Sequence, residues 1–189
     1  MKVFSYVVDH DHGTEPNPYY GKCTLCRCKY GVRREQTQGR RGQKNVVELA
    51  RPGDWVIGTG GASEDSVGRG RLVYAMLVDR VLRRGEFYQE FPKKSSEAPK
   101  NSFEREEQYA LVSEHFYYFG KKAPGIEQFK LEKNPRGFHY VDEIEFERFR
   151  RWLESKFSVG VNGEPKSPRG QFWNEAKRCV RAIKYKSCC

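Results

Sequence analysis

Short blocks of apolar and aromatic residues, separated by polar segments, run through the first two-thirds of the chain, a pattern typical of β-strands. Residues 2–8 have the composition of a first strand. Residues 54–60, which follow a Pro-Gly-Asp turn, and residues 72–82 are predicted to be two further strands. Another strand is expected at 109–112, and an aromatic segment at 115–119 follows it. The pattern therefore predicts a small β core.

Segments rich in Gly, Ser, Asp, Asn and Pro lie between the predicted strands, and these residues favour turns and loops. Three of the segments are residues 9–21, 61–70 and 92–102. A fourth, residues 33–45, holds basic residues among Gln and Gly and shows no apolar period. We expect each of these segments to be a loop.

The apolar period changes to that of a helix from Asp142 onward. One side of this predicted helix carries Ile144, Phe149, Trp152, Leu153 and Phe157. Residues 160–170 are rich in Gly and Pro and are expected to form a linker. A second amphipathic helix follows, with Phe172, Ala176, Cys179, Val180 and Ile183 on its apolar side. We therefore predict a β-rich domain over residues 1–158, which includes the helix 142–157, and a linker with a C-terminal helix over 159–189.

Strands on a glycine-punctuated path, followed by a terminal helix, predict an α+β fold. The Pro-Gly-Asp turn and the two strands after it resemble those of the PUA-like barrels, which include the EVE, YTH and ASCH domains. This resemblance implies a small PUA-like mixed β-barrel with flanking and C-terminal helices. In such barrels a modified or flipped base lies in a pocket walled by aromatic side chains.

Five sequence blocks occur in one order between residues 3 and 153. They are Phe4-Ser5-Tyr6-Val7-Val8, Pro16 to Gly21 with Cys23-Thr24-Leu25, Pro52 to Gly60, Leu72 to Met76, and His115 to Gly120. In this order the blocks resemble the nucleotide modification associated domain 2 family, which is found near DNA base-hypermodification systems of phages and bacteria. Residues 9–12, Cys26 and the run 33–44 depart from the family pattern. The resemblance implies a role in DNA base hypermodification or phage defence.

The charge of the chain points to a nucleic-acid partner. Lys and Arg number 35 against 25 Asp and Glu, the formal net charge is +10, and aromatic residues make up 14% of the 189 residues. Cations release the counterions of phosphate, and flat rings stack on unpaired bases. The residues expected to contact phosphate are Arg33, Arg34, Arg40, Arg41, Lys44, Lys93 and Lys94. The alternative is that the charge only keeps the protein soluble.

A base removed from its stack needs a π face and a group that pairs with its polar edge. The side chains expected to meet these needs are Asn17, Tyr19, Tyr20, Trp55, Thr59 and Tyr117. Alternation along 115–119 places His115, Tyr117 and Phe119 on one face and the other two aromatics on the opposite face. The alternative is that Trp55 belongs to the core, that Asn17 forms a turn and that His115 is structural.

Carboxylates and imidazoles cluster only at Asp9-His10-Asp11-His12. Such a group can bind a divalent metal or work as general acid and base. In an extended segment, His10 shares a face with His12, and Asp9 with Asp11. The candidates for acid–base catalysis are Asp9, Asp11, His12 and His115, and the alternative is a solvated polar loop.

Three thiols, Cys23, Cys26 and Cys28, lie within six residues, and Cys179, Cys188 and Cys189 offer a fourth ligand. Tetrahedral zinc usually takes two separated pairs of ligands, and this spacing supplies half of that signature. We therefore expect no cofactor, with zinc as the alternative.

The sequence carries no motif of a phosphate-binding loop, a nucleophile elbow, a zinc deaminase or a dinucleotide-binding fold. It also has no run of about 18 apolar residues, which a membrane span requires, so we expect a cytoplasmic protein without a membrane partner. The leading hypothesis is a module that recognises a modified base in nucleic acid or as a nucleotide. The alternatives are an enzyme of nucleotide or DNA base modification with an Asp/His site, and an RNA-binding module of the PUA-like type.

Overall fold

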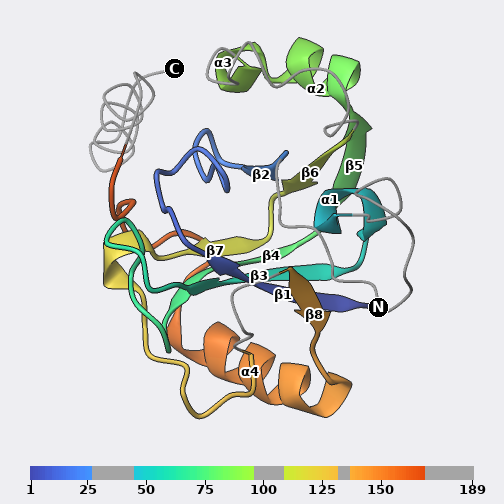
Figure 1. Ribbon diagram of the computed structural model, residues 1–189. Helices are drawn as coiled ribbons and strands as arrows, with labels where there is room; N and C mark the ends of the chain where they lie inside the picture. Colours follow the sequence, from blue (N-terminus) through green and yellow to red (C-terminus); the bar gives the residue numbers. More distant parts are fainter. Residues whose placement is uncertain (27–44, 96–108, 132–136, 169–189) are drawn as a thin grey trace, which may run out of the picture.

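The computed structural model describes residues 1–26, 45–95, 109–131 and 137–168. Two sheets and two groups of helices lie in layers (Figure 1). A six-stranded sheet occupies the middle, with the helix α4 (Glu143–Lys156) on one face and a three-stranded sheet on the other. The helices α2 (Arg84–Glu90) and α3 (Pro92–Ser95) lie beyond the smaller sheet. The predicted α+β class is confirmed.

The six-stranded sheet is mixed. In spatial order its strands are β8 (Phe138–Tyr140), β1 (Val3–Val8), β3 (Trp55–Gly60), β4 (Leu72–Leu77), β7 (Phe116–Tyr118) and β9 (Gly160–Val161). The pairs β1–β3 and β7–β9 are parallel, and the other neighbours are antiparallel. Residues far apart in the chain therefore meet at the ends of β1, β3 and β7.

The smaller sheet places β6 (Tyr109–Ser113) between β2 (Cys23–Leu25) and β5 (Arg80–Arg83), and both pairings are antiparallel. A one-turn helix α1 (Val46–Leu49) begins at Asn45, whose side chain accepts a hydrogen bond from the backbone of Glu48. Glu48 in turn accepts from the backbone of Asn45, which completes a capping box. The one remaining described element is a single 3₁₀ turn at Gly120–Lys122.

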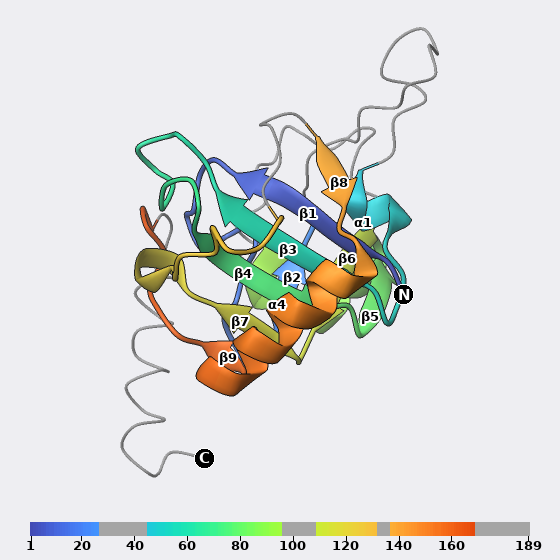
Figure 2. The same ribbon diagram turned by 90° about the horizontal axis from the view of Figure 1, so that it is seen from below.

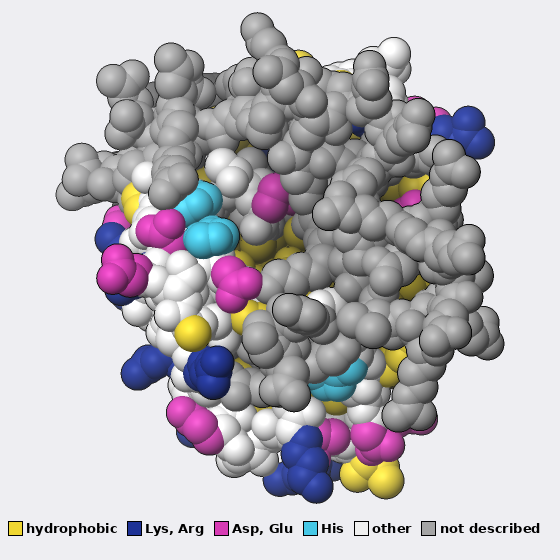
Figure 3. Space-filling model, viewed as in Figure 1, with side chains coloured by type: hydrophobic (Ala, Val, Ile, Leu, Met, Phe, Trp, Pro, Cys, Tyr) yellow, Lys and Arg dark blue, Asp and Glu magenta, His cyan; other side chains and the backbone are white. Residues whose placement is uncertain are grey.

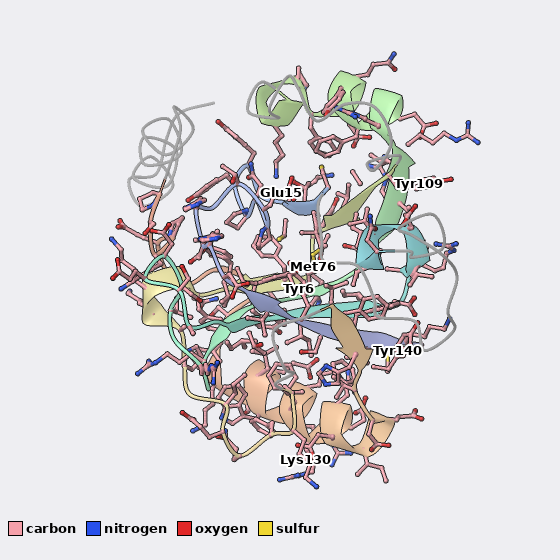
Figure 4. The ribbon with its side chains drawn as sticks, viewed as in Figure 1. Tyr6, Glu15, Met76, Tyr109, Lys130 and Tyr140 are labelled. Carbon is pink, nitrogen blue, oxygen red and sulfur yellow. The ribbon has the colours of Figure 1, made fainter. Side chains whose placement is uncertain are left out.

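Alternation along the strands divides the core between the two faces of the large sheet. Tyr6, Met76 and Tyr118 belong to the cluster between the two sheets, where Figure 4 shows the first two. Trp55 and Tyr117 belong to the cluster between the sheet and α4. The sequence prediction that Tyr117 and Tyr118 point to opposite faces is confirmed, and both faces are covered.

Helix α4 begins at Asp142, whose carboxylate accepts from the backbone of Ile144 and Glu145. It lies across the large sheet (Figure 2) and buries Phe146, Phe149 and Leu153. The prediction that Ile144 lies on the same side of the helix as Phe149 and Leu153 was wrong, since 75% of its surface is exposed. Among the described helices, none has the length and apolar character needed to cross a membrane.

The described start of the predicted loop 92–102 is the helix α3, and three further details differ from the prediction. The described strands form two separate sheets, and no barrel closes within the described residues, so the PUA-like barrel is not confirmed. The single strand predicted at 72–82 is divided, because the chain leaves the large sheet after Leu77 and enters the small one at Arg80. The described start of the predicted linker 160–170 forms β9.

Candidate functional site

Asp11 is a buried residue in the loop that follows β1. Its side chain is fully buried and accepts a short hydrogen bond from the hydroxyl of Tyr118. The other carboxylate oxygen accepts from the backbone N–H of Lys166 at 3.0 Å. Because Tyr118 is on β7 and Lys166 follows β9, this one carboxylate joins three distant parts of the chain.

Burial controls the proton affinity of this pair. It raises the pKa of Asp11, while the hydrogen bonds from Tyr118, Lys166 and Gly13 favour the carboxylate and lower it. Burial also raises the pKa of Tyr118 well above its usual value, and the neighbouring carboxylate adds to the effect. Tyr118 therefore stays a phenol and donates a hydrogen bond to Asp11.

His10 and His12 flank Asp11 and lie together on the outer side of the loop. Their rings stack with centroids 5.7 Å apart and an angle of 16° between the planes, which confirms the prediction that they share a face. Asp65 approaches from the loop between β3 and β4, with Oδ2 3.6 Å from Nδ1 of His10. Figure 3 shows histidines beside acidic side chains on this surface.

The loop that carries Asp65 is fastened to the loop after β1. The backbone N–H of Asp11 donates to the carbonyl of Asp65 at 3.0 Å. The hydroxyl of Ser66 accepts from the N–H of Gly61 and donates to the carbonyl of Val8, both at 2.7 Å. These bonds fix Asp65 relative to His10 and His12.

The segment after β9 packs on the same end of the molecule. Ser167 donates its N–H to the carbonyl of Asp11 at 2.9 Å, and its own carbonyl lies 2.8 Å from Nδ1 of His12. Gly120 lies directly under this segment, with φ +51°, and a Cβ there would lie 1.8 Å from the carbonyl oxygen of Glu164. Only glycine fits this approach.

A second polar cluster surrounds Lys94, which is 8% exposed. Its ammonium donates to the carbonyl oxygens of Asn17 and Lys22, at 3.1 and 2.8 Å, and to the hydroxyl of Thr24 at 3.3 Å. Burial lowers the pKa of Lys94 to about 8, although Cys23 and other neighbours raise it. Lys94 was predicted to contact phosphate, but it lies in the interior with protein oxygens around its ammonium.

Two of the thiols predicted as the alternative zinc ligands, those of Cys23 and Cys26, lie near Lys94. Cys23 is fully buried in β2, and burial raises the pKa of its thiol to about 12, so it stays protonated near neutral pH. Zinc binds the thiolate. Cys26 is half-buried, and its backbone N–H donates to the carboxylate of Glu15, which Figure 4 labels beside β2. Cys28 lies outside the described residues.

The residues predicted to bind a base divide between two sides of the large sheet. Trp55 and Tyr117 lie in the core against α4, and Trp55 packs on Phe146 with ring centroids 5.3 Å apart. His115 packs edge-on against both of them, away from Asp11. Thr59 is fully buried, 3.4 Å from the carbonyl of Tyr6. The structure therefore does not bring His115 to the other predicted acid–base residues.

The remaining predicted base contacts lie in a short hairpin on the other side. The backbones of Asn17 and Thr24 exchange two hydrogen bonds of 2.9 Å, and the side chain of Asn17 accepts from the N–H of Tyr19. Asn17 and Tyr19 are buried, and Tyr20, at φ 61°, is half-buried. Asp9 belongs to the loop of Asp11, and its carboxylate lies against Gly61.

The other predicted phosphate contacts, Arg33, Arg34, Arg40, Arg41 and Lys44, lie outside the described residues, as does the side chain of Lys93. Within the described ranges Lys and Arg equal Asp and Glu in number, 18 of each. The excess positive charge of the chain therefore belongs to the other segments. Residues 27–44 and 169–189 together hold 13 Lys and Arg and 2 Glu.

A cavity of about 310 Å³ opens where β1, β8 and the start of α4 meet. It is lined by Met1, Lys2, Val3, Tyr140, Val141 and Glu143. None of the predicted site residues lines it, and Tyr140 is 52% exposed.

Sequence reasoning missed Asp65, because a carboxylate in a glycine-rich loop carries no signal of its own. It also missed the role of Lys166 and Ser167, which lie 155 residues after their partners.

The comparisons with known proteins extend over the same part of the chain. A family model described as Nucleotide modification associated domain 2 matches residues 1–105 and 87–172. No curated protein and no solved structure matches the chain.

Proposed function

The chain belongs to the nucleotide modification associated domain 2 family, and from this premise we propose that it recognises a modified base, in DNA or as a nucleotide. The setting is DNA base hypermodification or phage defence. The observation that carries the proposal is the family match, which spans every described element. The proposal does not rest on the PUA-like barrel predicted from the sequence.

Binding to nucleic acid is supported by where the charge lies. Because the described residues are balanced in charge, the electrostatic attraction to phosphate comes from the basic segments 27–44 and 169–189. Phosphate contacts position a nucleic acid and carry no sequence information directly, whereas contacts to the base discriminate. Two separable contributions to affinity are expected.

We propose that the contact that discriminates between bases is made at the end of the molecule that carries the loop 9–21. The hydrogen bonds of Asp11 and Ser66 fix the backbone there, and exposed polar side chains such as His10 surround the fixed backbone. Polar groups that are already fixed bind a ligand without the loss of conformational entropy that ordering them would cause. The aromatic pair Trp55 and Tyr117 is covered by α4 and is not part of this end.

The test is equilibrium binding of the full chain to two DNAs of identical sequence, one plain and one carrying a hypermodified pyrimidine, over a salt series. We expect the modified DNA to bind more tightly and the ratio of the two affinities to persist as salt rises, because base contacts release few counterions. Equal binding that weakens in parallel for both DNAs would contradict the proposal. RNA of the same sequence serves as a third ligand and tests the RNA-binding alternative.

The convergence of His10 and His12 beside a buried carboxylate favours one second candidate, an enzyme of nucleotide or base modification. Incubation of the protein with plain and modified nucleotides, followed by mass spectrometry, separates the two functions. An enzyme converts a nucleotide, and His12→Gln abolishes the conversion. A recognition module leaves every nucleotide unchanged.

A further inference from the structure

His10, His12 and Asp65 bring three metal-ligating atoms together at one point of the surface. One nitrogen from each histidine and one carboxylate oxygen lie within 4.8 Å of one another. Ligand atoms around a shared ion lie about 3 to 3.5 Å apart, since each is about 2.0 to 2.2 Å from the metal. The side chain of His10 is 62% exposed, so it is free to make the remaining small movement.

The hydrogen bond of His12 prepares its ring for a metal. The carbonyl of Ser167, 2.8 Å from Nδ1, can only accept, so Nδ1 carries the proton. In the neutral ring the lone pair is then on Nε2, the nitrogen left for a ligand. Metal-binding histidines generally donate their second nitrogen to a carbonyl or carboxylate in this way, which fixes the tautomer and the ring orientation.

The scaffold under the three ligands is rigid and continuous. Asp11 is anchored inward by Tyr118 and Lys166, which turns the flanking His10 and His12 outward together. The hydrogen bond from the backbone N–H of Asp11 to the carbonyl of Asp65 holds the third ligand next to the same residue. None of these contacts involves the buried cluster around Lys94, so the site is separate from the thiols of Cys23 and Cys26.

We infer that His10, His12 and Asp65 form a binding site for a divalent first-row transition-metal ion. Two imidazoles and one carboxylate suit Zn²⁺ or Fe²⁺ and do not suit Mg²⁺ or Ca²⁺, which prefer oxygen ligands. Three protein ligands leave the remaining coordination positions open to water or to an oxygen of a bound molecule. The site rests on its own geometry and does not require that the protein bind nucleic acid.

The test is calorimetric titration of the metal-free, reduced full chain with Zn²⁺, with Fe²⁺ without oxygen, and with Mg²⁺. We expect one Zn²⁺ per chain, weaker Fe²⁺ and no measurable Mg²⁺. His10→Gln and His12→Gln should each weaken Zn²⁺ at least about 100-fold, the upper end of what loss of a supporting partner costs. His139→Gln, which removes an imidazole from β8, is the matched control and should bind as the wild type does.

A Co²⁺ spectrum of the same samples tests whether any of the six cysteines is a metal ligand. Thiolate ligands give an intense charge-transfer band, and nitrogen and oxygen ligands do not. The inference is overturned if wild-type Zn²⁺ binding is absent, if it survives in both histidine variants, or if the Co²⁺ spectrum shows thiolate ligation. Modified-DNA binding in the presence of a chelator is measured separately, so failure of the metal site and failure of the proposed function are distinguishable.

Discussion

Tyr118 and Asp11 form a buried hydrogen bond between residues that are 107 positions apart in the chain. Tyr118→Phe leaves the Asp11 carboxylate buried with one donor fewer. We expect the free energy of unfolding to fall by about 1 to 3 kcal/mol, the cost of a buried polar group that loses its partner. Urea denaturation measures the change.

The neighbouring substitution Tyr117→Phe is the matched control, because it removes the same hydroxyl from the opposite face of β7. That hydroxyl lies 3.4 Å from Nε2 of His115, a long contact, so a loss of about 0.5 kcal/mol is expected. Equal losses in the two variants would show that the hydrogen bond to Asp11 contributes no more to stability than the contact of Tyr117 does.

The buried ammonium of Lys94 makes stability depend on pH. Its pKa is about 8 in the folded protein and near 10.5 when unfolded, so the unfolded chain binds more protons between these values. The penalty for burying the charge is fully present below pH 8 and is relieved above it. We expect the free energy of unfolding to rise by about 1 kcal/mol from pH 8 to 9.

Cys23 has the opposite effect at higher pH. Its thiol has a pKa of about 12 when folded and 9.0 in the unfolded chain, so its contribution is lost as pH rises above 9. The curve should therefore level off above pH 9. Lys94→Met should remove the rise between pH 8 and 9, and a rise of the same size in that variant would rule Lys94 out as its cause.

Among the elements, the segment that begins with β9 depends on the glycine beneath it. Gly120→Ala places a Cβ against the carbonyl of Glu164 and also forces alanine into the left-handed region. We expect a loss of about 2 to 4 kcal/mol in unfolding free energy, since the left-handed conformation alone costs about 1 to 2 kcal/mol. Thermal unfolding of purified variants measures it.

Gly21→Ala is the control, because Gly21 has φ +74° and nothing lies within 4 Å of its Cβ position. It reports the conformational cost alone, so it should lose about 1 to 2 kcal/mol. If both variants lose the same amount, the segment 160–168 does not press on Gly120.

Local signals predicted several elements well. Strands β1, β3 and β6 and the start of α4 follow from apolar runs, a Pro-Gly-Asp turn and a change of apolar period at Asp142, all readable from the local sequence. The short strands β2, β8 and β9 were not predicted, because three or two residues carry no period and depend on their partners. Ile144 was misassigned because nine residues at 100° each put it opposite Leu153, whereas Phe146 lies on the buried side.

The candidate site shows the same division. The pattern Asp9-His10-Asp11-His12 was recognisable in the sequence, and alternation predicted that the histidines share a face. Asp65, Tyr118 and Ser167 join them only through the fold. For the whole molecule, composition predicted a basic protein but not that the described body is balanced in charge.

This distribution of charge leads to a prediction about salt dependence. Arg40→Gln with Arg41→Gln should lower the slope of log affinity for duplex DNA against log salt by about 2, one unit for each lost phosphate contact. Lys130→Gln with Arg151→Gln removes the same charge from the side of α4 and should leave the slope unchanged; Figure 4 shows Lys130 on that side. Equal effects from both pairs would mean that only the net charge matters.

We propose that a modified nucleotide binds at the end of the molecule formed by the loop 9–21, residues 61–66 and the segment 160–168. Amide chemical-shift mapping of the ¹⁵N-labelled full chain, titrated with a hypermodified pyrimidine nucleotide, tests this directly. We expect saturable shifts concentrated in these three segments. Shifts concentrated instead at Met1, Tyr140 and Val141, around the cavity beside α4, would contradict it.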